Sequence, residues 1–277
     1  HTKRDIIVRI EGTYNGSSDS QSVCEMPDMG RSHGDLPVKT LEPGIPENVK
    51  ETTIAVPYND LDLMERVLKE NEAAAVVIEA FASQTCHMRP SDGYLKSVKA
   101  LTQKYGALLI LDEVITFRLS IGGVHYLEEV TPDLIGMGKV IGGGFAVGAY
   151  GGRKDLMEIL NPGYGKDYLA LSGTFSGNPV TMTAGLATLK LYNKDEIDRI
   201  NGLGDRLKNG LKREAEKNGL PLTITGCGSL LGLNYTEKKI INGRDAYSAM
   251  LENAPFRRCV HLSAVNKGYY MMEKGRM

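Results

Sequence analysis

A lysine and an aspartate are the two residues of this sequence with the clearest chemical potential. Lys139 lies in TPDLIGMGKVIGGGFAVGAYGGR (131–153), with glycines on both sides. Glycines permit positive φ and close backbone approach to a ligand, so a lysine among them is a candidate nucleophile. Asp112 directly follows the apolar run ALLIL (107–111), as a carboxylate does at the carboxyl end of a buried strand. A Schiff-base amine and a carboxylate for a pyridinium nitrogen are what pyridoxal phosphate chemistry requires.

A glycine-rich loop with a lysine could also belong to a nucleotide site. The segment does not fit a P-loop, because Val140 stands where Ser or Thr would bind magnesium. Gly136 and Gly138 begin the spacing of a dinucleotide fingerprint, but the stretch does not run from a strand into a helix with an acidic residue beyond it. Nucleotide binding is therefore the weaker interpretation.

The elements around Asp112 predict a βαβ unit. AAAVVIEA (73–80) is a continuous apolar strand that ends near Glu79, and SDGYLKSVKALTQKYG (91–106) is an amphipathic helix that stops at Gly106. The strand ALLILDEV follows at once, and a right-handed crossover places Glu79 and Asp112 at the same sheet edge. We expect Glu79 either to be functional or to pair with a neighbouring basic group.

The remaining elements are predicted from caps and periodicity. Residues 5–10 form a core strand, 17–50 a long surface excursion, and 52–60 a strand that leads into a helix capped by Asn59. Asn178 and Pro179 mark the start of another helix, a charged helix with an apolar stripe from Ile197 to Leu211 begins at Asp195, and residues 222–236 form a strand pair.

Three sequence blocks in one order resemble the class III aminotransferases. They are LDEVITFRLSIGG (111–123), the lysine segment 131–153 and SGTFSGNP (172–179), and their wording is most similar to the branch of glutamate-1-semialdehyde 2,1-aminomutase. The resemblance begins at RDIIVRIEGTYNG (4–16) and continues to about residue 270. It identifies the chain as a fragment that lacks the N-terminal segment and the extreme C-terminal part of the family.

The resemblance implies an α/β fold, the pyridoxal-phosphate-dependent transferase fold type I. The expected architecture is a mostly parallel, seven-stranded sheet with flanking helices and a small C-terminal α+β domain. Residues 1–192 would form the large cofactor-binding domain and residues 193–277 the incomplete small domain. The expected cofactor is pyridoxal 5′-phosphate.

The resemblance also implies roles for individual residues. Lys139 would form the Schiff base and shuttle the proton, with burial favouring its neutral amine, and Asp112 would keep the ring nitrogen protonated. Val114 would pack on the cofactor ring, and Tyr14 would stack on it, with Asn15 where the family has histidine. Further cofactor contacts are expected from Gln84, where the family has an asparagine facing the phenolic oxygen, and from Gly173 and Thr174, the threonine reaching the other subunit's phosphate.

The implied activity is amino-group transfer or 1,2-migration on a small amino acid or amine, in a homodimer with a shared active site. An ω-transaminase, an epimerase or a non-catalytic truncated relative are the alternatives.

Composition agrees with an enzyme of this kind. A net charge of −1 argues against a nucleic-acid surface, and no apolar run approaches the length of a transmembrane span. Four cysteines without metal-ligand or disulfide spacing indicate reduced thiols in a cytoplasmic protein, and the histidines form no metal pattern.

Overall fold

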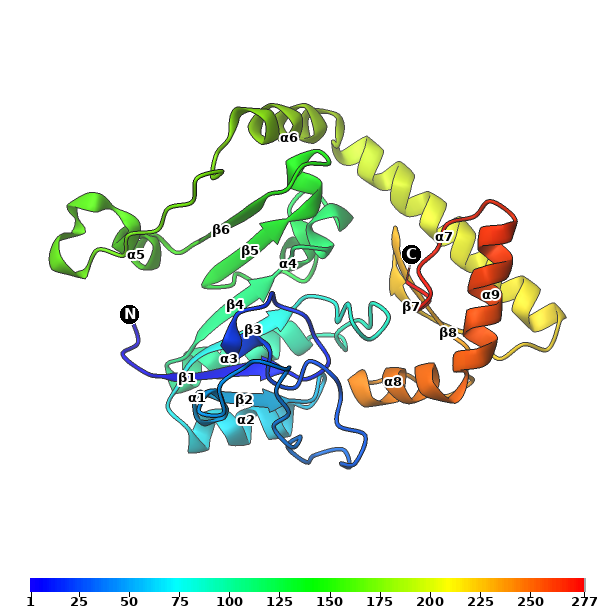
Figure 1. The fold of residues 1–277 in the computed structure, drawn as a ribbon, viewed down its shortest axis with the longest axis horizontal. Coiled ribbons are helices and arrows are strands. Elements are labelled where there is room, and N and C mark those ends of the chain that lie inside the picture. Colours follow the sequence, from blue (N-terminus) through cyan, green and yellow to red (C-terminus); the bar gives the residue numbers. More distant parts are fainter. Residues whose placement is uncertain (277) are drawn as a thin grey trace.

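The larger of two sheets organises the chain in the computed structural model, which describes residues 1–276 (Figure 1). Its strand order is β2-β1-β3-β4-β5-β6. The pairings from β2 to β5 are parallel, and β6 is an antiparallel edge strand. The prediction of a mostly parallel sheet is confirmed, although the described residues form six strands of the seven expected. The strands are β1 (Ile6–Ile10), β2 (Thr53–Val56), β3 (Ala73–Glu79), β4 (Leu108–Asp112), β5 (Leu134–Gly138) and β6 (Gly148–Gly152).

Helices flank the large sheet, and the C-terminal helices gather beside a second, two-stranded antiparallel sheet (Figure 1). That sheet consists of β7 (Thr223–Cys227) and β8 (Leu230–Asn234), as the sequence predicts. The boundary between a large domain, 1–192, and a small domain, 193–277, remains a prediction. The helices are α1 (Val49–Thr52), α2 (Leu61–Glu70), α3 (Tyr94–Tyr105), α4 (Gly123–Leu127), α5 (Lys154–Met157), α6 (Pro179–Leu191), α7 (Lys194–Lys217), α8 (Gly243–Glu252) and α9 (Ala254–Asn266).

The predicted βαβ unit forms the centre of the core. Alternate residues of β4, Leu109 and Leu111, are fully buried, and they join one cluster with Leu95 and Val98 of α3 and with residues of α2. Because side chains alternate across a strand, the other β4 side chains point to the opposite face and are only half-buried. Helix α3 ends at Gly106 with φ 70°, the left-handed conformation that glycine adopts without strain.

One local prediction is wrong in detail. The cap of α2 is Asp60, whose side chain accepts from the Leu63 amide, whereas Asn59 has a positive φ and ties the preceding turn to Ser91. In α7, the apolar stripe is not buried along its length, because Ile197 is buried while Leu203 is 49% exposed. Periodicity identified the helix correctly but not what covers it.

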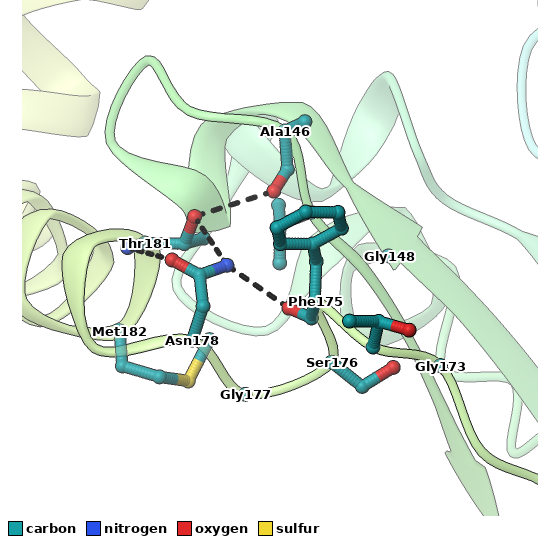
Figure 2. A pocket seen from close by; sticks show the side chains of 11 residues that line it. Ala146, Gly148, Gly173, Phe175, Ser176, Gly177, Asn178, Thr181 and Met182 are labelled. Carbon is teal, nitrogen blue, oxygen red and sulfur yellow. Dashed lines mark hydrogen bonds between the residues drawn. The ribbon is translucent and has the colours of Figure 1, made fainter.

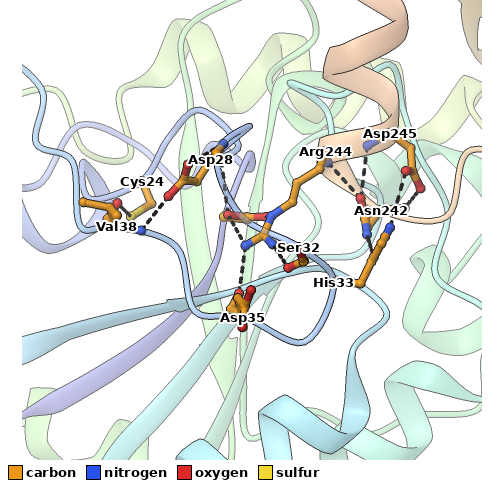
Figure 3. A network of polar contacts seen from close by, with 11 residues as sticks. Cys24, Asp28, Ser32, His33, Asp35, Val38, Asn242, Arg244 and Asp245 are labelled. Carbon is orange, nitrogen blue, oxygen red and sulfur yellow. Dashed lines mark hydrogen bonds and ion pairs between the residues drawn. The ribbon is translucent and has the colours of Figure 1, made fainter.

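A buried ion pair connects α8 to the end of β1 and to the loop that follows it. The Arg244 Nε donates to Glu11 Oε1 at 2.6 Å, and neither side chain is more than 6% exposed. The same guanidinium donates to the carbonyl oxygens of Ser32 and Asp35 in the surface loop (Figure 3). One arginine thus holds three segments together, including part of the excursion 17–50.

We expect Arg244→Gln to lower the free energy of unfolding by about 3–5 kcal/mol, since it leaves the Glu11 carboxylate buried without its cation. Urea unfolding measures this loss. The double variant Glu11→Gln/Arg244→Met should recover part of it, because no buried charge remains. As a matched control, Lys238→Gln removes an exposed pair with Glu252 and should change stability by about 1 kcal/mol or less. Equal effects of Arg244→Gln and Lys238→Gln would contradict this assignment.

Candidate functional site

The sheet brings Lys139 and Asp112 to the ends of adjacent strands. Asp112 is the last residue of β4 and is in register with Gly136 of β5, and Lys139 directly follows β5. Lys139 has φ 49°, an uncommon value for a residue with a side chain. The two residues therefore stand at the ends of adjacent strands, and their shared role stays a prediction. The expected burial is not found, because the Lys139 side chain is exposed.

Gly138, which directly precedes Lys139, packs against Val114. A Cβ at Gly138 would lie 3.2 Å from Val114 Cγ1 and 3.3 Å from the Val147 carbonyl oxygen. These contacts explain why glycine precedes the lysine. They also place Val114 between the ends of β4 and β5, where the resemblance expected it to face a cofactor ring.

The Asp112 carboxylate is held by two hydrogen-bond donors. The Val114 amide donates to Oδ1 at 2.9 Å, and the Asn15 Nδ2 donates to Oδ2 at 3.0 Å. Burial raises the pKa of Asp112, while these hydrogen bonds and the charge of Lys139 act in the opposite direction. Sequence reasoning missed this contact of Asn15, although its place in the turn after β1, which is separated from β4 only by β3, was the available signal.

Glu79 is a second carboxyl group at the same edge, in register with Asp112. Its Oε2 accepts from the backbone amides of Tyr14 and Ser83, each at 3.1 Å, and not from the basic group that we expected. Burial, with a contribution from the Asp112 charge, raises the pKa of Glu79 to about 7. Of the two neighbouring carboxyl groups, Glu79 is therefore the one that holds a proton near neutrality.

This raised pKa predicts a pH dependence of stability. Between its unfolded value, about 4.5, and about 7, folded Glu79 binds more proton than the unfolded chain, so the free energy of unfolding falls as pH rises through this window. Glu79→Gln, whose amide oxygen can accept both amides, should remove this fall, which amounts to about 1.4 kcal/mol per pKa unit. Urea unfolding at several pH values measures it. The exposed Glu47→Gln should leave the slope unchanged, and a parallel pair of curves for wild type and Glu79→Gln would refute the assignment.

Tyr14 and Gln84 lie near this edge on the loops after β1 and β3. The Tyr14 ring is 43% exposed, while its backbone amide is fixed on Glu79. Gln84 has a buried Oε1 that finds no hydrogen-bond partner among the described residues. A buried amide left without a partner is costly, which favours a polar ligand group beside it.

Glu113 is a residue at the site that sequence reasoning did not single out. It is fully buried and accepts from the amides of Val124 and His125, both at 2.7 Å, and from the Thr116 hydroxyl at 2.9 Å. The His125 Nδ1 lies 2.7 Å from the same carboxylate. Glu113 thus fixes the loop that leaves the end of β4. The unusual burial of a charged residue was not visible in the sequence.

Gly173 and Thr174 lie in an exposed segment before α6. They line a pocket of about 560 Å³ together with residues 146–148 and the start of α6, and neither Lys139 nor Asp112 is part of its wall (Figure 2). The predicted cap is confirmed, since Asn178 Oδ1 accepts from the Thr181 amide at 3.0 Å. Part of the same wall adjoins the lysine segment, since Gly148 is in register with Gly138 and a Cβ at Gly138 would lie 3.3 Å from the Val147 carbonyl oxygen.

The described residues contain no cluster of three or more potential metal-ligating side chains of His, Cys, Asp or Glu. Within the same part of the chain, no helix has the length and apolar character needed to cross a bilayer.

Comparison with known proteins defines the class. The family model described as aminotransferase class-III matches residues 1–275, and the chain belongs to this family. Glutamate-1-semialdehyde 2,1-aminomutase of Natranaerobius thermophilus is 41% identical over 253 residues, which cover 90% of this chain and 57% of the relative. The chain thus spans less than two thirds of the length of that protein.

Solved structures confirm the fold. An omega-transaminase from Sphaerobacter thermophilus matches with a TM-score of 0.94 and 33% identity over 99% of this chain and 63% of its own. A transaminase with pyridoxal phosphate bound matches with a TM-score of 0.87 and 27% identity over 99% of this chain and 62% of its own. Fold type I and the family's cofactor, pyridoxal 5′-phosphate, agree with the expectations from sequence.

The residues at the strand ends fit this cofactor. The half-buried Asp112 carboxylate is oriented by neutral donors, and no described cation lies within ion-pair distance of it, so a protonated ring nitrogen can complete its shell. The Lys139 amine follows the adjacent strand, and Gln84, whose buried Oε1 has no partner among the described residues, lies on the loop after β3. An amine, a carboxylate and a polar amide are the donor set that the cofactor requires.

Proposed function

We propose that the protein catalyses amino-group transfer or 1,2-migration with pyridoxal 5′-phosphate as cofactor, on a small amino acid or amine. The observation that carries the proposal is the juxtaposition of Lys139 and Asp112 at the ends of β4 and β5, on the fold of a class-III aminotransferase. When bound, the cofactor supplies an electron sink that stabilises negative charge at the substrate carbon.

Lys139 supplies the amine that binds the cofactor and, once released, moves the proton at the reacting carbon through its Nζ. Its position directly after β5, with Gly138 packed closely behind it, limits where this nitrogen can reach. Asp112 holds the ring nitrogen in its protonated form through its carboxylate oxygens. Burial raises the pKa of both carboxyl groups, and that of Glu79 reaches about 7, so Glu79 takes a proton near neutrality.

The neighbouring side chains orient and enclose the ring. Val114 offers an apolar surface beside Gly138, and Tyr14 offers an exposed aromatic face on the loop after β1. Gln84 binds the phenolic oxygen through its amide in this proposal, and its support is the buried Oε1 that lacks a partner among the described residues. These three roles are proposed because the residues lie on the loops that follow the strands carrying Asp112 and Lys139 or their neighbours, where pyridoxal 5′-phosphate would bind.

The particular reaction we propose is that of the aminomutase, which moves an amino group within glutamate 1-semialdehyde. The 41% identity to the Natranaerobius thermophilus enzyme supports it. The TM-score of 0.94 to an omega-transaminase favours a second candidate, transfer between two substrates. Incubating the protein with glutamate 1-semialdehyde alone discriminates them, since an aminomutase converts it without any amino acceptor. Conversion only after an acceptor is added would favour the transaminase, and none in either case would indicate a non-catalytic relative.

We also propose that the protein is a cytoplasmic homodimer in which Thr174 of one subunit binds the phosphate of the cofactor held by the other subunit. Thr174 is exposed, and the pocket that it lines does not include Lys139 or Asp112 of the same chain, which supports this arrangement. Large apolar side chains are exposed on and near α6, with Phe175 at 81%, Val180 at 59% and Leu186 at 57%. Several large apolar side chains exposed on one segment are a feature of subunit interfaces.

Hybrid dimers test the shared site. A dimer of one Lys139→Ala subunit and one Thr174→Ala subunit should contain one site with both lesions and one with neither. Such hybrids should recover up to about half of the wild-type activity per dimer, because one intact site remains. Activity of purified, differently tagged hybrids measures this. If the hybrids are no more active than the two parents, or if the active protein sediments as a monomer, Thr174 acts within its own chain.

A further inference from the structure

The side chain of Asn15, an uncharged residue outside β4, forms a direct hydrogen bond with the Asp112 carboxylate. It follows Tyr14 in the turn after β1, and its Nδ2 lies 3.0 Å from Asp112 Oδ2. Its Oδ1 lies 3.2 Å from the Thr13 hydroxyl, whose single proton also has the Ile10 carbonyl oxygen as an acceptor at 2.7 Å. The opposite amide orientation would place two acceptor oxygens against each other at Asp112, so the hydrogen bonds fix the amide with its donor toward the carboxylate.

The turn that carries Asn15 is itself rigidly held. The buried Arg9 guanidinium donates to the Thr13 carbonyl oxygen at 2.6 Å and to the Val23 carbonyl oxygen at 2.6 Å. On the other side of the turn, the Tyr14 amide donates to Glu79. The amide of Asn15 is therefore held in place before any ligand binds, and its hydrogen bond to Asp112 costs little further ordering.

We propose that Asn15 is a positioning residue that keeps the Asp112 carboxylate charged and aimed at the cofactor ring without adding a titratable group of its own. The resemblance places a histidine at this position, and imidazole changes its charge near neutral pH. An amide donates one hydrogen bond at every pH at which the protein is folded. The inference rests on the proposed function, because Asp112 must face the cofactor for Asn15 to matter.

The uncharged state of the Asn15 amide matters because Asp112 already has charged neighbours. A carboxylate with two acidic neighbours and one base would respond to any further titrating group at about 3 Å, because Coulomb interactions at that distance inside a protein are strong. The groups that face or adjoin it are the Asn15 amide, the Val114 backbone amide, Glu79 on β3, Glu113 next in sequence and Lys139 after β5.

Three substitutions of Asn15 test the proposal through the dissociation constant of pyridoxal 5′-phosphate and the absorbance spectrum of the bound cofactor from about pH 5.5 to 9. Asn15→Ala should weaken binding about tenfold, because a hydrogen bond to a charged group is lost. Asn15→Asp, nearly isosteric, should weaken it further and recover as pH falls, since two adjacent carboxylates repel. Asn15→His should restore binding relative to Asn15→Ala but add a spectral transition near its own titration, about pH 6.5, that wild type lacks.

Asn218→Ala is the matched control, since Asn218 ends α7 and donates only to the Glu214 carbonyl oxygen. It should bind and absorb as wild type does. If Asn15→Ala fails to fold, the Asn15→Asp and Asn15→His variants still decide the matter. Wild-type affinity and a pH-independent spectrum in both would overturn the role of Asn15 while leaving the proposed function intact. A wild-type protein that forms no borohydride-reducible adduct at Lys139 would instead overturn the proposed function.

Discussion

Replacing Lys139 with alanine should abolish the borohydride-reducible linkage between protein and cofactor and lower turnover by about 10⁴-fold or more. Two functions are lost together, the amine that binds the cofactor and the base that moves the proton, and proton transfer alone contributes up to about 10⁴-fold. Lys139→Arg should be equally inactive, because guanidinium keeps the charge but offers neither a free amine nor a base. Peptide mapping after reduction, together with the turnover number, measures both losses.

The matched control for Lys139 is Lys154→Ala, an exposed lysine at the start of α5 that lies after the same glycine-rich segment. It should retain the reducible linkage and full turnover. A reduced adduct that maps to Lys154 or to any other lysine would remove Lys139 from the centre of the site. Restoration of part of the Lys139→Ala activity by an added small primary amine would strengthen the assignment, because it returns only the missing base.

The elements that carry the site could be predicted because their signals are local. The apolar run 107–111, the amphipathic helix 91–106 and its Gly106 stop specify the βαβ unit without reference to the rest of the chain. Parallel strands end at one sheet edge, so the order of these elements already places Glu79 beside Asp112. The caps at Asn178 and Gly106 were predictable for the same reason.

What the sequence could not show are contacts that depend on distant segments. Asn15 meets Asp112 across 97 positions, and Arg244 meets Glu11 across 233, and no local pattern encodes either pair. The exposure of Lys139 was also unpredictable, because burial depends on what packs over the sheet edge and not on the strand that ends there. Glu79 shows the same limit: its position was predicted, but its partners are backbone amides that have no side-chain signature.

Asp112→Asn should lower turnover by about 10²–10³-fold while the protein still folds and binds cofactor. The substitution keeps the size of the side chain and the acceptor for the Val114 amide, but it removes the charge that holds the ring nitrogen protonated. It also turns the second oxygen into an amino group that faces the Asn15 donor, so one hydrogen bond is lost as well. The visible spectrum of the bound cofactor and the turnover number measure the two consequences separately.

A double variant separates the charge of Asp112 from its hydrogen bond. In Asn15→Asp/Asp112→Asn the donor and acceptor exchange places, so the hydrogen bond is restored and one carboxylate remains at the edge, but on the loop after β1 instead of at the end of β4. Thermal stability should return toward wild type, whereas turnover should stay as low as in Asp112→Asn, because the charge no longer lies where the ring nitrogen binds. If turnover returns with stability, the hydrogen bond and not the position of the charge is what the reaction needs. Near-normal turnover in Asp112→Asn alone would remove this carboxylate from the mechanism, since a residue that holds the electron sink in its active form cannot be replaced without a loss of rate.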